Sequence, residues 1–271
     1  MEVAIKSNTN KKYLGLFLQS RQAMQVSPGT MQFYRVKLGR FFAELNPNIS
    51  QRQDIEAFLL HFKNPGNRHA YYRAIRTFYR WREETFGLPS PMQKMKAPKI
   101  PKVILPVLTK EKVLKLIDST VSIRNKAIIS LLTESGLRLS EATNIKQEDI
   151  DWKDRIIKVR AKGQKEVLST FGDMTAKYLK EWLAQYQPVN NIWGMDKWGI
   201  ISMLRRLEKA TGLKCNPHVF RRTFACLLRQ AGLNTLTIKD LGGWTTTFMV
   251  EHYTRSMGFH DSLKFYKGPL S

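Results

Sequence analysis

Six side chains in the second half of the chain are of the types that attack or stabilise a phosphate ester. Two stretches hold most of them. GLRLSE (136–141) supplies an Arg, and HVFRRTFACLLRQAGLNTLTIKDLGGWTTTFMVEHY (218–253) supplies four more. A lysine lies between these stretches in AKGQK (161–165). The candidate catalytic residues are Arg138, Lys162, His218, Arg221, Trp244 and Tyr253.

Transesterification at a phosphodiester builds negative charge on the nonbridging oxygens, so fixed positive donors must face them. Arg138 and Arg221 suit this task because a guanidinium stays charged and can form two parallel hydrogen bonds. His218 lies one helical turn before Arg221 and can face the same phosphate. The indole N–H of Trp244 can only donate. These four residues predict a phosphate-binding set that needs no metal.

The remaining two residues fit the proton transfers and the attack itself. Lys162, at the tip of a turn, can act as general acid because an ammonium group readily shifts its pKa when desolvated. Tyr253 fits the covalent nucleophile, activated by the surrounding cations from a free pKa near ~10. The set therefore predicts nucleophilic attack by a tyrosine on a nucleic-acid backbone.

Local patterns predict the elements that carry these residues. The Arg138 stretch starts a short helix after Gly136 ends the preceding one. The only convincing β region is a hairpin, with strands RIIKV (155–159) and EVLSTF (166–171) on either side of the AKGQK turn. Asp173 then caps a helix that extends to about Tyr186, and helices resume near Trp198.

The first hundred residues predict a bundle of four helices. Apolar residues recur at steps of three and four, and Asn and Pro mark the breaks. We expect Ser50 to be the N-cap of the third helix, and 64–66 (Asn-Pro-Gly) to form a turn before the fourth. The four expected helices cover 11–24, 30–45, 51–62 and 67–86.

The fourth helix carries a basic stripe. Arg73, Arg76 and Arg80 follow one another at steps of three and four and so share a face, which could lie along a phosphate backbone. A solvated basic face without a ligand is the alternative. Several aromatic residues of this helix are expected in the core rather than stacked on bases, namely Tyr71, Tyr72, Phe78, Tyr79 and Trp81.

Residues 89–107 are rich in Pro and Lys and predict a basic interdomain linker. The predicted organisation is a helical DNA-binding domain at 1–88, the linker at 89–107, and a catalytic domain with a C-terminal tail at 108–271. A helix capped by Thr109 opens the last of these. The expected fold class is mainly α with a small β-sheet.

The charge points to a polyanionic partner. The formal net charge is +23 and the sequence pI is about 10.1, so nucleic acid is the leading partner and an anionic membrane the second. No stretch reaches the ~18 apolar residues of a membrane span, and the N-terminus lacks an apolar signal core. Cys215 and Cys226 lack CxxC spacing and are expected to be free thiols of an intracellular protein.

The ordered motifs resemble those of the tyrosine recombinases, the integrase family that includes the Xer proteins and the Cre recombinase. GLRLSE is similar to the family's first arginine box, with Glu141 at the position of its supporting acid. AKGQKEV resembles the lysine hairpin, and HVFRRTFA resembles the second box. GGWTTTFMVEHYTR resembles the tyrosine box, with the usual nine residues from Trp244 to Tyr253. The helical N-terminal region is similar in plan to the family's core-binding domain.

The resemblance implies a site-specific recombinase that cleaves and rejoins DNA for integration, excision or resolution. Its implied intermediates are a 3′-phosphotyrosyl link and a Holliday junction. No metal or nucleotide cofactor is implied, and the sequence has neither a P-loop nor an HExxH motif. The implied partners are double-stranded DNA sites and three further copies in a DNA-bound homotetramer, with accessory proteins left open. The expected location is the cytoplasm, with the nucleoid, or the interior of a host cell.

Three departures from the family pattern affect these expectations. Trp244 stands where most Xer-like members have His, although Cre also has Trp there. STF follows the hairpin where many relatives have Val-Pro-Leu, so Lys165 is the alternative to Lys162. The tail after Tyr253 has 271 − 253 = 18 residues, enough to dock on a neighbouring protomer only as a single helix or strand.

Two other functions share part of the pattern. A type IB topoisomerase uses the same phosphate chemistry, but its clamp would need more β structure in the N-terminal domain. A catalytically silent DNA-binding regulator would lack a catalytic residue, and none of the expected residues is missing from this chain.

Overall fold

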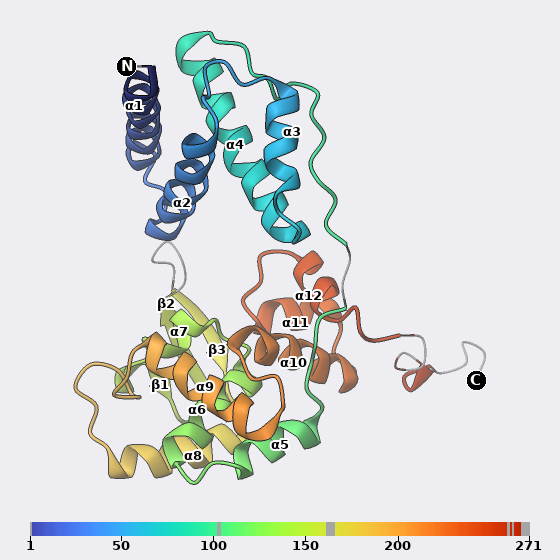
Figure 1. The fold of residues 1–271 in the computed structure, drawn as a ribbon. Helices are drawn as coiled ribbons and strands as arrows, with labels where there is room; N and C mark the ends of the chain where they lie inside the picture. Colours follow the sequence, from blue (N-terminus) through green and yellow to red (C-terminus); the bar gives the residue numbers. More distant parts are fainter. Residues whose placement is uncertain (1, 102–103, 161–165, 259–260, 262, 267–271) are drawn as a thin grey trace. The chain divides into compact units, whose positions relative to one another are not determined.

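The computed structural model describes residues 2–101, 104–160, 166–258, 261 and 263–266, with side chains described from residue 12 onward. The chain divides into two compact units, Met1–Val103 and Ile104–Ser271 (Figure 1). The division falls inside the segment 89–107 for which the sequence predicts a linker. Each unit has its own buried apolar core.

The first unit is a bundle of four helices, as the sequence predicts. It contains α1 Glu2–Ala23, α2 Pro28–Glu44, α3 Arg52–Leu60 and α4 Pro65–Phe86. Helix α2 packs against α1 and α4, and α3 packs against α4. The five aromatic residues of α4 expected in the core are all buried there, which confirms that part of the prediction. Phe17 of α1 and Phe41 of α2 belong to the same buried cluster.

The first helix was predicted to start at residue 11 but starts at Glu2, and two further predictions about the starts of α3 and α4 were wrong by one or two residues. The backbone N–H of Gln51 donates to Asp54 Oδ2 at 2.7 Å, so Gln51 is the N-cap of α3, while the Ser50 hydroxyl donates back to the Asn46 carbonyl. The Asn-Pro-Gly stretch is not a separate turn, because Asn64 caps α4 and Pro65 is its first residue. Proline suits that position, where its missing N–H would have had no partner.

Residues just after α4 pack on the first unit. Met92 and Met95 are buried in its core, and the Tyr72 hydroxyl donates to the Met95 carbonyl at 2.7 Å. The Arg82 guanidinium is also buried and donates to the carbonyl of Pro89 at 3.2 Å. The first part of the Pro-rich segment is therefore held by apolar burial and by hydrogen bonds to its carbonyls.

The second unit surrounds a three-stranded antiparallel sheet in the order β1-β2-β3. The hairpin β2–β3 confirms the predicted β region, with Ile157 paired to Ser169 and Val159 to Val167. The short strand β1 was missed because two residues carry no alternation to read. The strands are β1 Ile150–Asp151, β2 Ile156–Arg160 and β3 Glu166–Thr170.

Helices lie before and after this sheet in the chain, and several of them pack against its strands. In chain order they are α5 Lys110–Asp118, α6 Ile123–Ser135, α7 Leu139–Thr143, the 3₁₀ turn η1 Gln147–Asp149, α8 Asp173–Gln185, α9 Lys197–Thr211, α10 Pro217–Gln230, α11 Thr235–Leu241 and α12 Thr247–Tyr253. Helix α6 packs against α5, α8 and α10 and is buried along most of its length. It is the central helix from which the Arg138 turn emerges.

Helix α8 starts differently from the prediction. Gly172 is its N-cap, and Asp173 makes no capping hydrogen bond. The cap comes instead from Glu134 on α6, which accepts hydrogen bonds from the Gly172 N–H at 3.1 Å, the Thr175 N–H at 3.0 Å and the Thr175 hydroxyl at 2.6 Å. A carboxylate from a distant helix thus replaces the local cap that the sequence suggested.

None of the helices in the described part of the chain combines the length and apolar character needed to cross a membrane. Cys215 and Cys226 are free and buried, in agreement with the prediction. The mainly helical fold with a small sheet confirms the expected fold class.

Candidate active site

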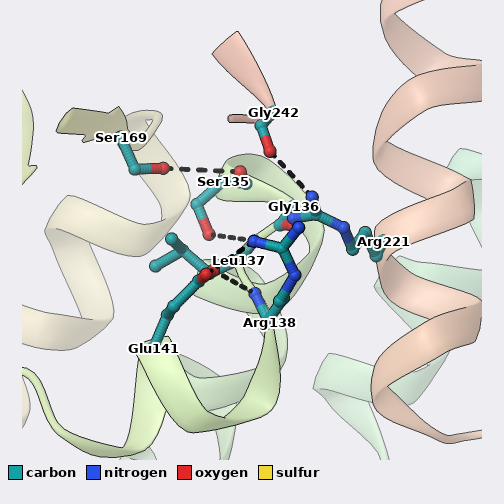
Figure 2. A network of polar contacts seen from close by, with 8 residues as sticks. All are labelled: Ser135, Gly136, Leu137, Arg138, Glu141, Ser169, Arg221 and Gly242. Carbon is teal, nitrogen blue, oxygen red and sulfur yellow. Dashed lines mark hydrogen bonds and ion pairs between the residues drawn. The ribbon is translucent and has the colours of Figure 1, made fainter. Parts of the chain in front are cut away.

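Uncharged contacts hold the turn between α6 and α7, from which Arg138 projects. Gly136 ends α6 at a positive φ of 60°, and a Cβ there would lie 2.4 Å from a ring carbon of Phe224. The Ser135 carbonyl accepts a hydrogen bond from the Ser169 hydroxyl of β3, and the Ser135 hydroxyl accepts from the Leu137 N–H (Figure 2). Close packing therefore requires glycine at position 136, and these hydrogen bonds hold the turn in a single conformation.

Arg138 leaves this turn at the N-cap position of α7. Its backbone N–H donates to Glu141 Oε2 at 2.8 Å, and its Nη1 donates to Glu141 Oε1 at 2.7 Å. Glu141 is 6% exposed, whereas the Arg138 side chain is 47% exposed. The buried carboxylate thus anchors one edge of a guanidinium whose remaining surface faces solvent.

Arg221 of α10 is held in a different way. It is 3% exposed, and it donates from Nη1 to the Gly136 carbonyl and from Nη2 to the Gly242 carbonyl at 2.9 Å (Figure 2). Its guanidinium carbon lies 4.4 Å from the centre of the Trp244 ring. One side chain therefore joins three segments that are far apart in the sequence.

Burial makes the charge of Arg221 costly. Loss of hydration is the largest cause that lowers its pKa to about 10, followed by the nearby charge of Arg138, while Glu141 and the Tyr253 hydroxyl act in the opposite direction. No carboxylate in the described part of the chain forms an ion pair with Arg221. The free protein thus holds a buried cation that an anion would stabilise.

Trp244 and Tyr253 lie beside this cation. The Trp244 ring is 5% exposed, and its Nε1–H finds no acceptor among the described residues. The rings of Trp244 and Tyr253 meet edge to face, with centroids 5.6 Å apart and planes at 72°. Gly242 allows this packing, since a Cβ there would lie 2.1 Å from a carbon of the Trp244 ring. Tyr253, at the end of α12, is half-buried.

His218 stands in the first turn of α10, next to the N-cap Asn216, whose side chain accepts from the Val219 N–H. Its side chain is exposed, but partial loss of hydration lowers its pKa, and the charges of Arg222, Arg221 and Arg138 lower it further. A histidine among three arginines therefore favours the neutral form in the absence of an anion.

The predicted lysine is the one candidate catalytic residue whose position stays a prediction. Lys162, and its alternative Lys165, lie outside the described residues. The hairpin below them is described: Lys158 of β2 pairs with Glu166 of β3 at 2.9 Å, and β3 packs against α11. A Cβ on Gly243 would touch Val167 of β3 at 3.4 Å. The first residues of β3 therefore border the glycine turn that precedes Trp244.

Arg222 is a further arginine near the site, one that the sequence did not single out. It is 8% exposed, and its Nε donates to the Pro106 carbonyl at 3.0 Å. Its charge helps to lower the pKa of His218. Loss of hydration lowers the pKa of Arg222 itself, while the Tyr253 hydroxyl acts in the opposite direction. Its spacing of four residues from His218 on a helix was the signal that could have revealed it.

The predicted DNA-binding arginines are exposed on α4 of the first unit. Arg73 lies over the Phe33 ring at 5.4 Å, Arg76 donates to the Tyr72 hydroxyl at 3.2 Å, and Arg80 pairs with Glu84 at 2.8 Å. The stripe exists as a surface of α4, and its role stays a prediction.

A family model and individual relatives assign this chain to the same protein family. A model of the phage integrase family matches residues 106–258, more than half of the chain. The tyrosine recombinase XerA of Pyrococcus horikoshii is 27% identical over 245 residues, which cover 84% of each chain. The tyrosine recombinase XerC of Myxococcus xanthus is 29% identical over 216 residues, covering 70% of this chain and 72% of the relative.

Solved structures share the fold. A lambda integrase dimer bound to a COC′ core site matches with a TM-score of 0.77 at 16% identity, over 92% of this chain and 96% of that one. A lambda integrase tetramer bound to a Holliday junction matches with a TM-score of 0.74 at 15% identity, over 88% of this chain and 77% of that one. With the family model spanning most of the second unit, the chain belongs to the phage integrase family and is a tyrosine-type recombinase.

Proposed function

We propose that this recombinase cuts and rejoins DNA at specific sites with Tyr253 as the nucleophile. The tyrosine oxygen loses its proton and bonds to the scissile phosphorus, while the bond from phosphorus to the 5′ oxygen breaks. The products are a 3′-phosphotyrosyl link and a free 5′-hydroxyl. A 5′-hydroxyl from a second duplex then reverses the step, which joins the strands through a Holliday junction.

The observation that carries this proposal is a buried cation without a counter-ion and a buried N–H donor without an acceptor among the described residues, both beside the tyrosine. The Arg221 guanidinium is buried without an acidic partner, and the Trp244 Nε1–H is buried without an acceptor, each in the described part of the chain. The Arg221 guanidinium carbon lies 4.4 Å from the centre of the Trp244 ring. Burying a charge or a donor unpaired is costly, so their arrangement fits a site that an anionic oxygen completes.

The other residues fill the remaining roles. Arg138, with an exposed guanidinium anchored by Glu141, would donate to a second nonbridging oxygen. His218 would donate once the phosphate raises its pKa. Lys162, or Lys165 in its place, would give a proton to the leaving 5′ oxygen. Metal ions and nucleotides have no role in this scheme, because the phosphotyrosyl bond conserves the energy of the broken bond.

The assembly and the wider contacts follow from the same proposal. The first unit would bind the duplex with the stripe Arg73, Arg76 and Arg80, each paired with backbone phosphates. Four copies would hold two DNA sites, and the lambda integrase tetramer bound to a Holliday junction has the same fold. The protein would act beside DNA inside the cell, in the cytoplasm or in a host cell, with accessory proteins where a site requires them.

Covalent trapping tests the proposal. Duplexes that the chain binds would first be selected from a random pool, and a 5′-bridging phosphorothiolate would then be placed at successive positions of the selected site. We expect an SDS-resistant adduct for the wild type and none for Tyr253→Phe. Tyr178→Phe, a partly buried tyrosine on α8, is the matched control and should form the adduct normally.

Other outcomes would assign the protein elsewhere. Tight, salt-sensitive binding without any adduct would contradict cleavage and favour a silent DNA-binding regulator. Adduct formation with relaxation of supercoils at any sequence would favour a type IB topoisomerase. An adduct that persists in Tyr253→Phe would assign the nucleophile to another residue.

A further inference from the structure

One face of α10 continues past the residues already placed in the site. His218, Arg222, Cys226 and Arg229 follow one another at steps of four, four and three, so they lie along one side of the helix. The first two border the phosphate-binding groups. Cys226 contacts the carbonyl of Tyr253, and Arg229 contacts the side chain of Thr254. The second half of this face therefore touches the end of α12.

Cys226 contacts the segment directly. Its Sγ donates to the carbonyl of Tyr253 at 3.5 Å and lies 3.8 Å from the Ser256 hydroxyl. The Cys226 side chain is 3% exposed, so it cannot itself touch DNA. Burial raises the pKa of this thiol, which keeps the proton that the hydrogen bond needs.

Thr254, the residue after the tyrosine, makes the second contact. Arg229 Nη1 donates to the Thr254 hydroxyl at 3.4 Å, and this hydroxyl donates to the Val250 carbonyl at 3.0 Å. Thr254 is 3% exposed and closes α12 as its C-cap. The hydroxyl therefore links an arginine of α10 to the last turn of the helix that carries Tyr253.

These contacts matter because α12 is short. It has seven residues, and the last four carbonyls of a helix have no donor within it. A helix of this length is not stable alone, so contacts with other elements must hold it in place. Since α10 also carries Arg221, a tie between α10 and the end of α12 sets where the tyrosine stands relative to the phosphate-binding groups.

We propose that Cys226 and Thr254 are positioning residues that hold Tyr253 for attack from within its own chain. This inference rests on the proposed function of Tyr253 and adds the device that aligns it. Neither side chain takes part in bond making or proton transfer. Their effect is expected on the cleavage step and on the order of the segment 250–258, with DNA affinity unchanged.

Four variants separate this role from general packing. Cys226→Ala removes the thiol, Cys226→Ser keeps a donor at that place, and Thr254→Val removes the hydroxyl but keeps the shape. Cys215→Ala is the matched control: Cys215 is also free and 1% exposed, but it lies before α10 and makes no hydrogen bond to α12.

Hydrogen–deuterium exchange on the full chain without DNA measures the tie independently of activity. We expect amides of 250–258 to exchange roughly fivefold to tenfold faster in Cys226→Ala and Thr254→Val, the size of one lost hydrogen bond. Cys226→Ser and Cys215→Ala should exchange like the wild type. Unchanged exchange in Cys226→Ala and Thr254→Val would overturn the proposal.

Single-turnover cleavage of the phosphorothiolate duplex gives the second readout. We expect roughly tenfold slower adduct formation in Cys226→Ala and Thr254→Val, with an unchanged Kd for DNA, because a displaced nucleophile loses alignment. The activated leaving group makes the general acid unnecessary, so a slow reaction reports on the tyrosine. Faster exchange with a wild-type cleavage rate would overturn the proposal, as would equal slowing by Cys215→Ala. A wild type that forms no adduct would refute the function of Tyr253 instead.

Discussion

Arg138 and Arg221 present the same guanidinium group from two different kinds of structure. Arg138 is held by a carboxylate three residues away, through a backbone and a side-chain hydrogen bond, and remains 47% exposed. Arg221 is held by two carbonyls that lie 85 and 21 residues away and by the face of Trp244, and is 3% exposed. One is positioned locally and the other by the tertiary fold.

The difference decides how each charge is tolerated. Arg138 has its counter-ion in Glu141, so its charge is balanced in the free protein. Arg221 has none in the described part of the chain, and burial lowers its pKa to about 10. The buried arginine is therefore the group whose electrostatics a bound phosphate would change most.

Replacing each arginine by lysine should produce the largest contrast. We expect Arg221→Lys to slow cleavage by about 10²–10³, the cost of a lost transition-state donor. A lysine starts from a pKa near ~10.4, so the burial that lowers the pKa of Arg221 would bring it toward neutrality. Arg138→Lys, in an exposed position, should keep its charge and lose only about tenfold.

The pH dependence of single-turnover cleavage checks this explanation. The rate of Arg221→Lys relative to wild type should recover as the pH falls from 8 to 6, because the buried lysine regains its proton. The relative rate of Arg138→Lys should stay flat over this range. Equal losses in the two variants, with equal pH profiles, would show that burial does not separate the two arginines.

Besides loss of hydration, the charges of Arg221 and Arg138 both lower the pKa of His218. We expect a smaller effect on this pKa than on the cleavage rates of the lysine variants. Loss of hydration and then the charges of Arg222, Arg221 and Arg138 lower its pKa. We therefore expect an NMR titration midpoint below the ordinary value of about 6.5, and a higher midpoint in Arg138→Ala. Lys146→Ala removes an exposed cation that does not act on His218 and should leave the midpoint unchanged.

The sign for stability follows from the same shift. A folded-state pKa below the unfolded one means that the folded protein binds the His218 proton less tightly. The stability contribution of His218 is thus present above a pH of about 6.5 and is lost as the pH falls through its folded pKa. Arg138→Ala should reduce this loss, measured as Tm against pH. A midpoint that falls in Arg138→Ala would contradict the assignment.

The smallest effects are expected on the stripe of α4, whose three arginines are all exposed. Arg76→Ala should reduce the slope of log Kd against log salt by about 1, the loss of one phosphate contact. Arg80→Ala should change it less, because Arg80 already pairs with Glu84. Arg52→Ala removes an arginine of α3 that also pairs at i+4 and should leave the slope unchanged. An equal loss of slope in Arg52→Ala would show that the net positive charge of the protein, and not the stripe on α4, determines the salt dependence.

The local parts of the site could be predicted from the chain. The short helix at Arg138 and the paired strands β2 and β3 follow from a helix-ending glycine and from alternating β-branched residues. The bundle of four helices follows from apolar steps of three and four. Such patterns depend only on neighbouring residues, so they can be recognised without knowledge of the tertiary fold.

Other features could not be predicted, because their partners are far away in the sequence. Glu134 caps α8, although Asp173 is the local candidate. Met92 and Met95 enter the core of the first unit from a segment whose composition resembles a linker. Burial of that kind depends on which surfaces meet, and a sequence window does not contain them.

The sequence by itself determined the candidate reacting groups, namely which arginines, histidine, tryptophan and tyrosine the chain offers and in which order. Only the tertiary structure decided that Arg221 is a buried cation without an acid in the described part of the chain, that the Trp244 donor lacks an acceptor there, and that α10 holds the end of α12. The reason is physical. Residue types fix the chemistry available, whereas hydration, charge balance and alignment depend on neighbours that only folding brings together.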